Sequence, residues 1–126
     1  MRLKNVLLVV KDIEVSKRFY KDLFQLEVIT DFGRNVILSE GLVLQEKTLW
    51  EEFVEQKVVP GGNAMELYFE HNDLDAFAKK LEESLYEIQY VNHLMQHEWG
   101  QRVIRFYDPD MHLIEVGERV ESKEGD

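Results

Sequence analysis

The chain has 126 residues, no cysteine, and a formal net charge of −10 from 25 acidic and 15 basic residues. This length suits one folded domain with a core of its own, and the missing cysteines exclude disulfides, thiolate metal sites and cysteine nucleophiles. The acidic balance disfavours nucleic acid and anionic membrane surfaces as partners. We find neither a secretory leader nor an apolar run of membrane-spanning length, so we expect a cytoplasmic protein.

The first half of the chain predicts a strand, a helix and three further strands. Residues 5–10 form a continuous apolar run, which is typical of a buried strand. The helix is capped by Asp12 or Ser16 and reaches about Phe24, because apolar residues recur there at helical spacing. Turn-forming residues separate the three strand candidates at 27–31, 35–39 and 42–46.

The second half repeats this order after a break. Residues 48–62 read as a linker with a short amphipathic turn of helix. A strand at 64–70 follows, then a helix capped by Asn72 or Asp73, a strand at 87–91, and two antiparallel strands between 102 and 116 that are joined by the turn Asp108-Pro109-Asp110.

We therefore predict an α+β fold in which two βαβββ modules form a curved mixed sheet around a cavity, called the cup here. Module 1 covers residues 1–47 and module 2 covers residues 63–117. Residues 118–126 are rich in acidic side chains and lack apolar periodicity, so we expect a frayed tail there.

Several short motifs resemble the vicinal oxygen chelate superfamily, which includes glyoxalase I, bleomycin and fosfomycin resistance proteins and extradiol dioxygenases. They are Val10-Lys11-Asp12, Ser16 with Phe19-Tyr20, Asp108-Pro109-Asp110 and Leu113-Ile114-Glu115-Val116. The resemblance covers nearly the whole chain and implies paired βαβββ modules, commonly in a homodimer. Gln25 and Met111 stand where the family usually has glycine in a left-handed conformation.

The resemblance also implies four metal-ligand positions, which fall on Asn5, Gln45, Ala64 and Glu115. An amide is a poor ligand for a transition metal and a methyl group is none, so only Glu115 is a strong ligand. Glu66 shares a strand face with Ala64 and offers a second carboxylate. A site of Glu66, Glu115, Gln45 and water would favour a hard divalent cation over zinc.

Glu115 is unusual because it lies inside an apolar strand, where a carboxylate needs a partner or water. Three explanations stay open: a wet strand face, a bound cation, or an ion pair with Arg105. Arg105 shares a strand face with Tyr107, and Tyr68 shares one with Glu66, so these four residues and Glu115 are expected to line the cup.

Trp50 lies in the linker and Trp99 lies just before the penultimate strand. Each either closes the core or stacks on a planar or cationic ligand at the mouth of the cup. His93 and His97 are four residues apart, but the nearby Gly100 favours a loop or hairpin, and we expect both histidines to be solvated.

These observations favour a glyoxalase/bleomycin resistance-like protein that binds a small aromatic or cationic molecule beside a degenerate metal site. The expected ligand-binding residues are Trp50, Trp99, Tyr68, Arg105, Tyr107, Gln45 and Asn5. One alternative is a divergent lyase or isomerase, in which a divalent cation on Glu115 and Glu66 polarises the substrate while a carboxylate moves a proton. A second alternative is a dimeric domain without catalysis.

Overall fold

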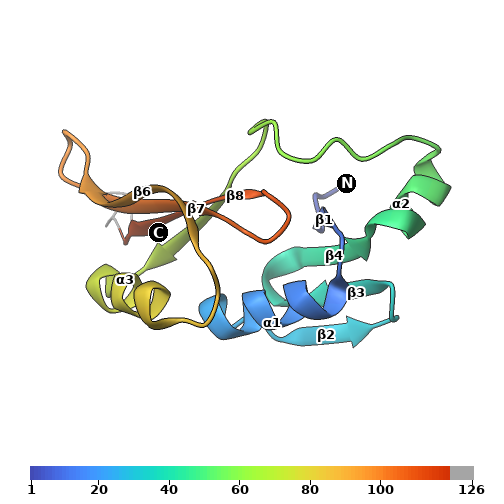
Figure 1. Cartoon of the computed structure of the whole chain (residues 1–126), viewed down its shortest axis with the longest axis horizontal. Helices are drawn as coiled ribbons and strands as arrows, with labels where there is room; N and C mark the ends of the chain where they lie inside the picture. The colour runs from blue at the N-terminus through green and yellow to red at the C-terminus, as the bar shows by residue number, and fades with distance from the viewer. Residues whose placement is uncertain (120–126) are drawn as a thin grey trace. The chain divides into compact units, whose positions relative to one another are not determined.

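The computed structural model describes residues 1–119, which form two compact units (Figure 1). Among the described residues, the first unit contains residues 1–62 and 109–111, and the second contains residues 63–108 and 112–119. Each unit carries one four-stranded mixed sheet, with an amphipathic helix between its first two strands, in the order βαβββ; the first unit has a second, shorter helix after its last strand. The predicted fold class, with its repeated module, is therefore confirmed.

The first unit is built on sheet A, whose strands lie in the order β1-β4-β3-β2. Strand β1 pairs with β4 in parallel, and the other pairs are antiparallel. Its elements are β1 (Val6–Val10), α1 (Ile13–Phe24), β2 (Val28–Asp31), β3 (Asn35–Leu38), a 3₁₀ turn (Ser39–Gly41), β4 (Leu42–Glu46) and α2 (Lys47–Val54).

Helix α1 forms where the sequence predicts it, because both of its ends are satisfied. The Asp12 side chain accepts hydrogen bonds from the backbone N–H groups of Glu14 and Val15, which caps the first turn. Phe19 and Tyr20 are buried with their rings 5.1 Å apart, edge to face. The helix ends at Phe24, and the next residue, Gln25, has a φ of 54°, the left-handed conformation that the family resemblance implies at this position.

Strand β1 differs from the prediction of a fully buried strand. Leu8 and Val10 are buried, but Val6 and Leu7 are 43% and 40% exposed. The reason is topological: β1 is at the edge of sheet A, so strand neighbours cover it on one side only.

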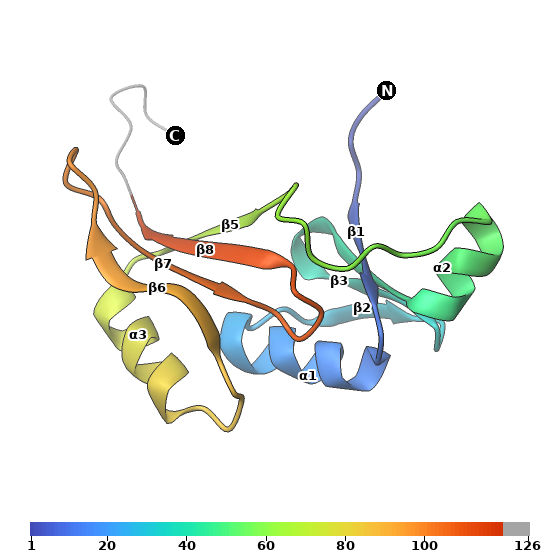
Figure 2. The same cartoon turned by 45° about the horizontal axis from the view of Figure 1, so that its top comes forward.

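The second unit is built on sheet B, with strand order β5-β8-β7-β6, which can be followed in Figure 2. Strand β5 is parallel to β8, and the other pairs are antiparallel. Its elements are β5 (Leu67–His71), α3 (Leu74–Glu83), β6 (Gln89–Gln96), β7 (Arg102–Tyr107) and β8 (Leu113–Glu118). Strand β5 begins three residues later than predicted, and β6 extends five residues further.

Helix α3 covers one face of sheet B and leaves the other face open (Figure 1). The Asp73 side chain caps α3 by accepting from the backbone N–H of Ala76. The Phe77 ring lies 6.3 Å from that of Phe106, and Ile104, Phe106, Ile114 and Val116 are buried on the helix side. The alternating residues of β7 and β8 therefore belong to the open face.

Glu118, which we expected in the frayed tail, is the last residue of β8. Its carboxylate accepts hydrogen bonds from the backbone N–H and the Nε of Arg102, at 3.1 and 2.6 Å. The prediction was wrong here because a charged side chain was taken as a sign of solvation. Residues 120–126 of the expected tail lie outside the described residues.

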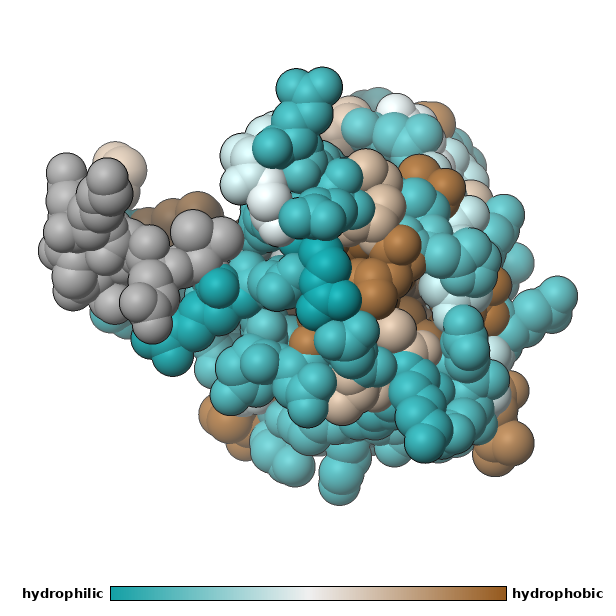
Figure 3. Space-filling model, turned by 90° about the vertical axis from the view of Figure 1, so that its left-hand side faces the viewer, coloured by the Kyte–Doolittle hydropathy of each residue, from teal (hydrophilic) through white to brown (hydrophobic). Residues whose placement is uncertain are grey.

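No helix within residues 1–119 is long and apolar enough to cross a membrane. The face drawn in Figure 3 is mainly hydrophilic, with its apolar side chains in small groups.

The left-handed conformation of Gln25 predicts that Gln25→Gly stabilises the protein. A non-glycine residue at this φ is strained by about 1 kcal/mol, which glycine avoids. The control is Gln25→Ala, which removes the side chain and its hydrogen bond to the Asp22 carbonyl but keeps the strain. Urea unfolding should give a free energy of unfolding about 1 kcal/mol higher for the glycine variant than for the alanine variant. Equal values for the two variants would show that Gln25 is unstrained.

Candidate functional site

The open face of sheet B carries a row of four polar side chains that crosses all four strands. In the strand register, Tyr68 of β5 is paired with Glu115 of β8, Glu115 with Arg105 of β7, and Arg105 with Asn92 of β6. Paired residues in neighbouring strands point to the same face of a sheet. This row, together with Glu66, His97, Trp99 and Gln101, is called the polar face below.

Arg105 holds the centre of the polar face. Its Nε donates to Glu115 Oε1 at 3.0 Å, and its Nη1 donates to Asn92 Oδ1 at 3.1 Å. Its Nη2 lies 3.3 Å from His97 Nε2, which accepts because a guanidinium can only donate. The side chains of Arg105 and Glu115 are only 23% and 12% exposed. Of the three explanations for Glu115, the ion pair with Arg105 is the one that the structure shows.

Glu66 places a second carboxyl group beside Glu115. Partial desolvation, the charge of Glu115 and a hydrogen bond with its side chain raise the pKa of Glu66, while the charge of Arg105 partly offsets the rise. Much of the Glu66 residue remains exposed, so solvent screens this repulsion to some extent. The polar face thus holds two carboxyl groups against one guanidinium.

From Arg105 to the edge of the polar face, a series of side-chain contacts links two aromatic rings, an amide and a tyrosine hydroxyl. The ring of His97 stacks on that of Trp99, with centroids 4.1 Å apart. The indole Nε1 of Trp99 donates to Gln101 Oε1 at 3.3 Å, and Gln101 Nε2 donates to the Tyr68 hydroxyl at 2.7 Å. Trp99 and Tyr68 are 73% and 48% exposed, yet both are tied to neighbouring side chains.

Gly117 explains how Tyr68 and Gln101 lie so close to the sheet. A Cβ atom at Gly117 would overlap the Tyr68 hydroxyl and would come within 2.8 Å of Gln101 Nε2. The absence of a side chain therefore leaves the space that both groups occupy.

Other residues expected at the site have separate roles within their own units. Tyr107 donates its hydroxyl proton to Asn63 Oδ1 at 2.6 Å, and Gln45 Nε2 donates to Asn35 Oδ1 at 3.0 Å. Asn5 is exposed just before β1, and Trp50 is half-buried on α2. Asn5, Gln45 and Trp50 belong to the first unit, whereas the polar face belongs to the second.

The residues present do not fit the metal site that the resemblance implies. Asn5, Gln45 and Ala64 supply two amides and a methyl group, and Glu115 is bound to Arg105. Across residues 1–119, no three His, Cys, Asp or Glu side chains are grouped so that they could hold a metal. A divalent cation would also have to compete with a guanidinium that is already in place.

Sequence reasoning missed Asn92, His97 and Gln101. Strand β6 contains a bulge, because Tyr90 pairs with Phe106 whereas Asn92 pairs with Arg105, so β6 has one extra residue between them. Simple alternation would have put Asn92 on the helix side. Both His93 and His97 were expected to be solvated. His93 is exposed, but His97 is half-buried and is contacted by Trp99 and Arg105. Nothing in the sequence around Gln101 indicates its contact with Tyr68.

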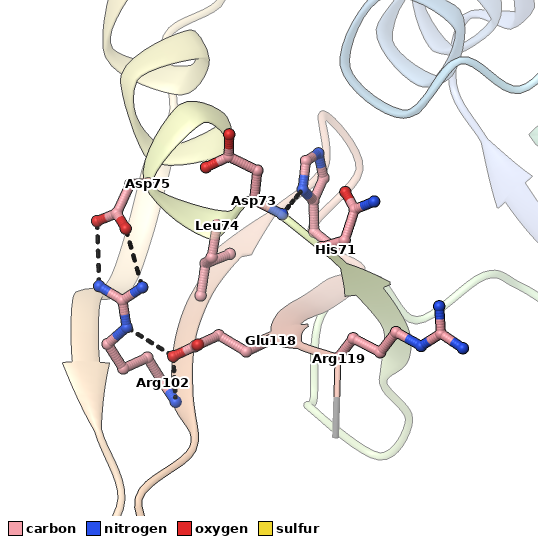
Figure 4. A pocket seen from close by; sticks show the side chains of 8 residues that line it. His71, Asp73, Leu74, Asp75, Arg102, Glu118 and Arg119 are labelled. Atoms are coloured by element: carbon pink, nitrogen blue, oxygen red, sulfur yellow. Dashed lines mark hydrogen bonds and ion pairs between the residues drawn. The ribbon is translucent and has the colours of Figure 1, made fainter. Parts of the chain in front are cut away.

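A separate pocket of about 260 Å³ lies where β5 meets α3 (Figure 4). Three of its charged groups bind one another: Arg102 binds both carboxylate oxygens of Asp75 at 3.0 and 2.9 Å, and it also binds Glu118. These bonds raise the pKa of Arg102 and lower that of Asp75. His71 Nδ1 accepts from the backbone N–H of Asp73 at 2.9 Å. The ion pairs that line this pocket therefore have a structural role.

Comparisons with known proteins identify a family and several solved structures that share this fold. The model of the glyoxalase-like domain family matches residues 3–121. A crystal structure of a protein of unknown function from Agrobacterium tumefaciens is 38% identical, with a TM-score of 0.82 and 95% of each chain covered. No curated protein sequence matches the chain significantly.

Two further structures share the fold at lower identity. A glyoxalase-related enzyme from Fulvimarina pelagi is 19% identical, with a TM-score of 0.81, and covers 99% of this chain and 95% of its own. A lactoylglutathione lyase from Agrobacterium tumefaciens is 22% identical, with a TM-score of 0.71, and covers 93% and 92%. The family match over nearly the whole chain, together with these structures, shows that the protein belongs to the glyoxalase-like domain family of the vicinal oxygen chelate superfamily.

Proposed function

We propose that this protein binds a small aromatic or cationic molecule on the polar face of its second unit, without the metal centre of its enzymatic relatives. The observation that carries the proposal is the pair of exposed aromatic side chains, Trp99 and Tyr68, which are held in place by Gln101 and His97. Exposed aromatic rings that are already ordered lose little conformational entropy when a planar ligand stacks on them.

The charges beside these rings support the same class of ligand. Glu66 and Glu115 together outnumber the single guanidinium of Arg105 on the polar face. A cation that lies over an aromatic ring and next to a carboxylate gains from both contacts. Anionic ligands would meet the repulsion of Glu66, because Arg105 is already engaged by Glu115, Asn92 and His97.

The metal-dependent lyase or isomerase gains no support from the donors in this chain. That reaction needs a cation held by several ligands, and the described residues that stand at the expected positions are mostly amides and a methyl group. Arg105 instead supplies the positive charge opposite Glu115. Binding without metal chemistry is therefore the function that the geometry supports best.

Tryptophan fluorescence tests this proposal, since the chain has one tryptophan on the polar face and one on α2. Titration with thioflavin T, a planar cation, should quench the emission of the wild type and of Trp50→Phe. The quenching should be lost in Trp99→Phe, and the affinity should fall about tenfold if stacking contributes about 1.4 kcal/mol. Quenching that follows Trp50 instead, or no quenching in any of the three proteins, would contradict ligand binding at the polar face.

We also propose that the protein is a cytoplasmic homodimer. The lack of cysteine agrees with a reducing compartment, and the apolar residues Val6 and Leu7 are exposed along the edge strand β1. An uncovered apolar edge strand is a surface that proteins usually protect.

Sedimentation equilibrium should give a mass twice the 15.0 kDa of one chain. Leu7→Lys should shift the equilibrium toward monomer, because a lysine would be buried at the contact. Leu85→Lys is the matched control, since Leu85 is fully exposed in the second unit. A monomeric wild type, or equal dissociation in both variants, would argue against a contact through β1.

A further inference from the structure

The directions of the hydrogen bonds around Gln101 are fixed by its neighbours. The indole Nε1–H of Trp99 can only donate, and the backbone carbonyl of Glu118 can only accept. Gln101 therefore presents its Oε1 to Trp99 at 3.3 Å and its Nε2 to the Glu118 carbonyl at 3.1 Å. The same Nε2 lies 2.7 Å from the Tyr68 hydroxyl, so the hydroxyl oxygen is the acceptor of that bond.

This arrangement leaves the hydroxyl proton of Tyr68 available. A phenol hydroxyl both accepts and donates, and Gln101 uses only its capacity to accept. Within residues 1–119, no group of the protein takes the proton in a hydrogen bond. The hydroxyl lies over Gly117, two residues further along β8 than Glu115, and Tyr68 is 48% exposed. A molecule that binds on the polar face can therefore accept this proton.

The neighbouring donors of the polar face are less available to a ligand. Arg105 and Asn92 donate to other groups of the protein. His97 accepts through Nε2, so its own proton is on Nδ1, but its ring is stacked on one face of Trp99. A ligand that stacks on the other face of the indole is separated from His97 by the indole itself. Tyr68 is therefore the donor for such a ligand.

We propose that the ligand is a planar aromatic compound that carries an uncharged hydrogen-bond acceptor, such as a carbonyl oxygen, at its edge. Its ring stacks on the open face of Trp99, and its acceptor receives the hydroxyl proton of Tyr68. The two contacts lie close together, since one amide, that of Gln101, binds both the indole and the hydroxyl. The acceptor is uncharged because Arg105, the cation of the polar face, is already paired with Glu115. The inference rests on the proposed function and narrows its class of ligand.

Two probes of equal charge and similar size test the acceptor. One is an N-methylquinolinium cation with an acetyl group on its carbocyclic ring, and the other has an ethyl group at the same carbon. Both stack as planar cations, but only the acetyl compound has a carbonyl oxygen. In isothermal titration calorimetry, the wild type should bind the acetyl compound about fivefold more tightly, which is the effect of one ordinary hydrogen bond.

Tyr68→Phe removes the donor and keeps the ring. Loss of the bond with Gln101 would weaken the binding of both probes alike, so the readout is the ratio of their two dissociation constants. This ratio should fall to about one in Tyr68→Phe. Tyr90→Phe is the matched control, because Tyr90 pairs with the buried Phe106 on the helix side of the same sheet and should keep the wild-type ratio.

Gln101→Glu tests the direction of the hydrogen bond without removing either ring. A carboxylate can only accept, so it would take the hydroxyl proton of Tyr68 as well as the indole N–H of Trp99. The hydroxyl then has no proton for a ligand, and the preference for the acetyl compound should be lost. The added negative charge acts on both probes alike because their charges are equal.

The remaining outcomes separate this inference from the proposed function. Equal affinities of the wild type for the two probes would overturn the inference and leave the proposed function standing. A preference for the acetyl compound that persists in Tyr68→Phe would also overturn the inference, since another donor would then be responsible. If neither probe nor thioflavin T binds the wild type, the inference and the proposed function are both overturned.

Discussion

The ion pair between Arg105 and Glu115 is the interaction on which the polar face depends. Glu115 lies between the apolar residues Ile114 and Val116 of β8, where an unpaired carboxylate is destabilising by several kcal/mol. Arg105 meets this requirement, and its other two nitrogens bind Asn92 of β6 and His97 of the hairpin. One side chain therefore fixes the positions of groups from three separate segments. The second carboxyl group of the face, Glu66, lies beside this ion pair, and partial desolvation and the charge of Glu115 raise its pKa.

Most of the fold could be predicted from the sequence because it rests on local patterns. The caps Asp12 and Asp73 and the apolar spacing of both helices act within a few residues, and the repeat makes the second half a check on the first. The predictions failed where a contact joins distant residues. The bulge in β6 turns Asn92 to the open face, and Glu118 extends β8 because Arg102 binds it. The pairing of Glu115 with Arg105 was one of three open explanations, since alternation gives a face but not a partner.

The family motifs around Asp12, Ser16 and Asp110 have structural roles in the first unit. The Asp110 carboxylate accepts from the backbone N–H of Lys11 at 2.9 Å and from the Ser16 hydroxyl at 3.5 Å. Asp12 caps the helix whose residues Phe19 and Tyr20 fill the core. These residues specify how the chain folds, which explains why the family is evident although the expected metal ligands are replaced. Apart from Glu115, which is part of a motif and of the polar face, membership and chemistry are thus encoded at different positions.

Gly117 carries a consequence for related sequences. Its missing side chain is the space into which the Tyr68 hydroxyl and the Gln101 amide fit, so the three positions constrain one another. A relative with alanine or a larger residue at the position of Gly117 has no room for the same tyrosine and glutamine, whatever its overall identity. The combination of Tyr68, Gln101 and Gly117 therefore distinguishes relatives that have the aromatic side chains of the polar face from relatives that share the fold alone.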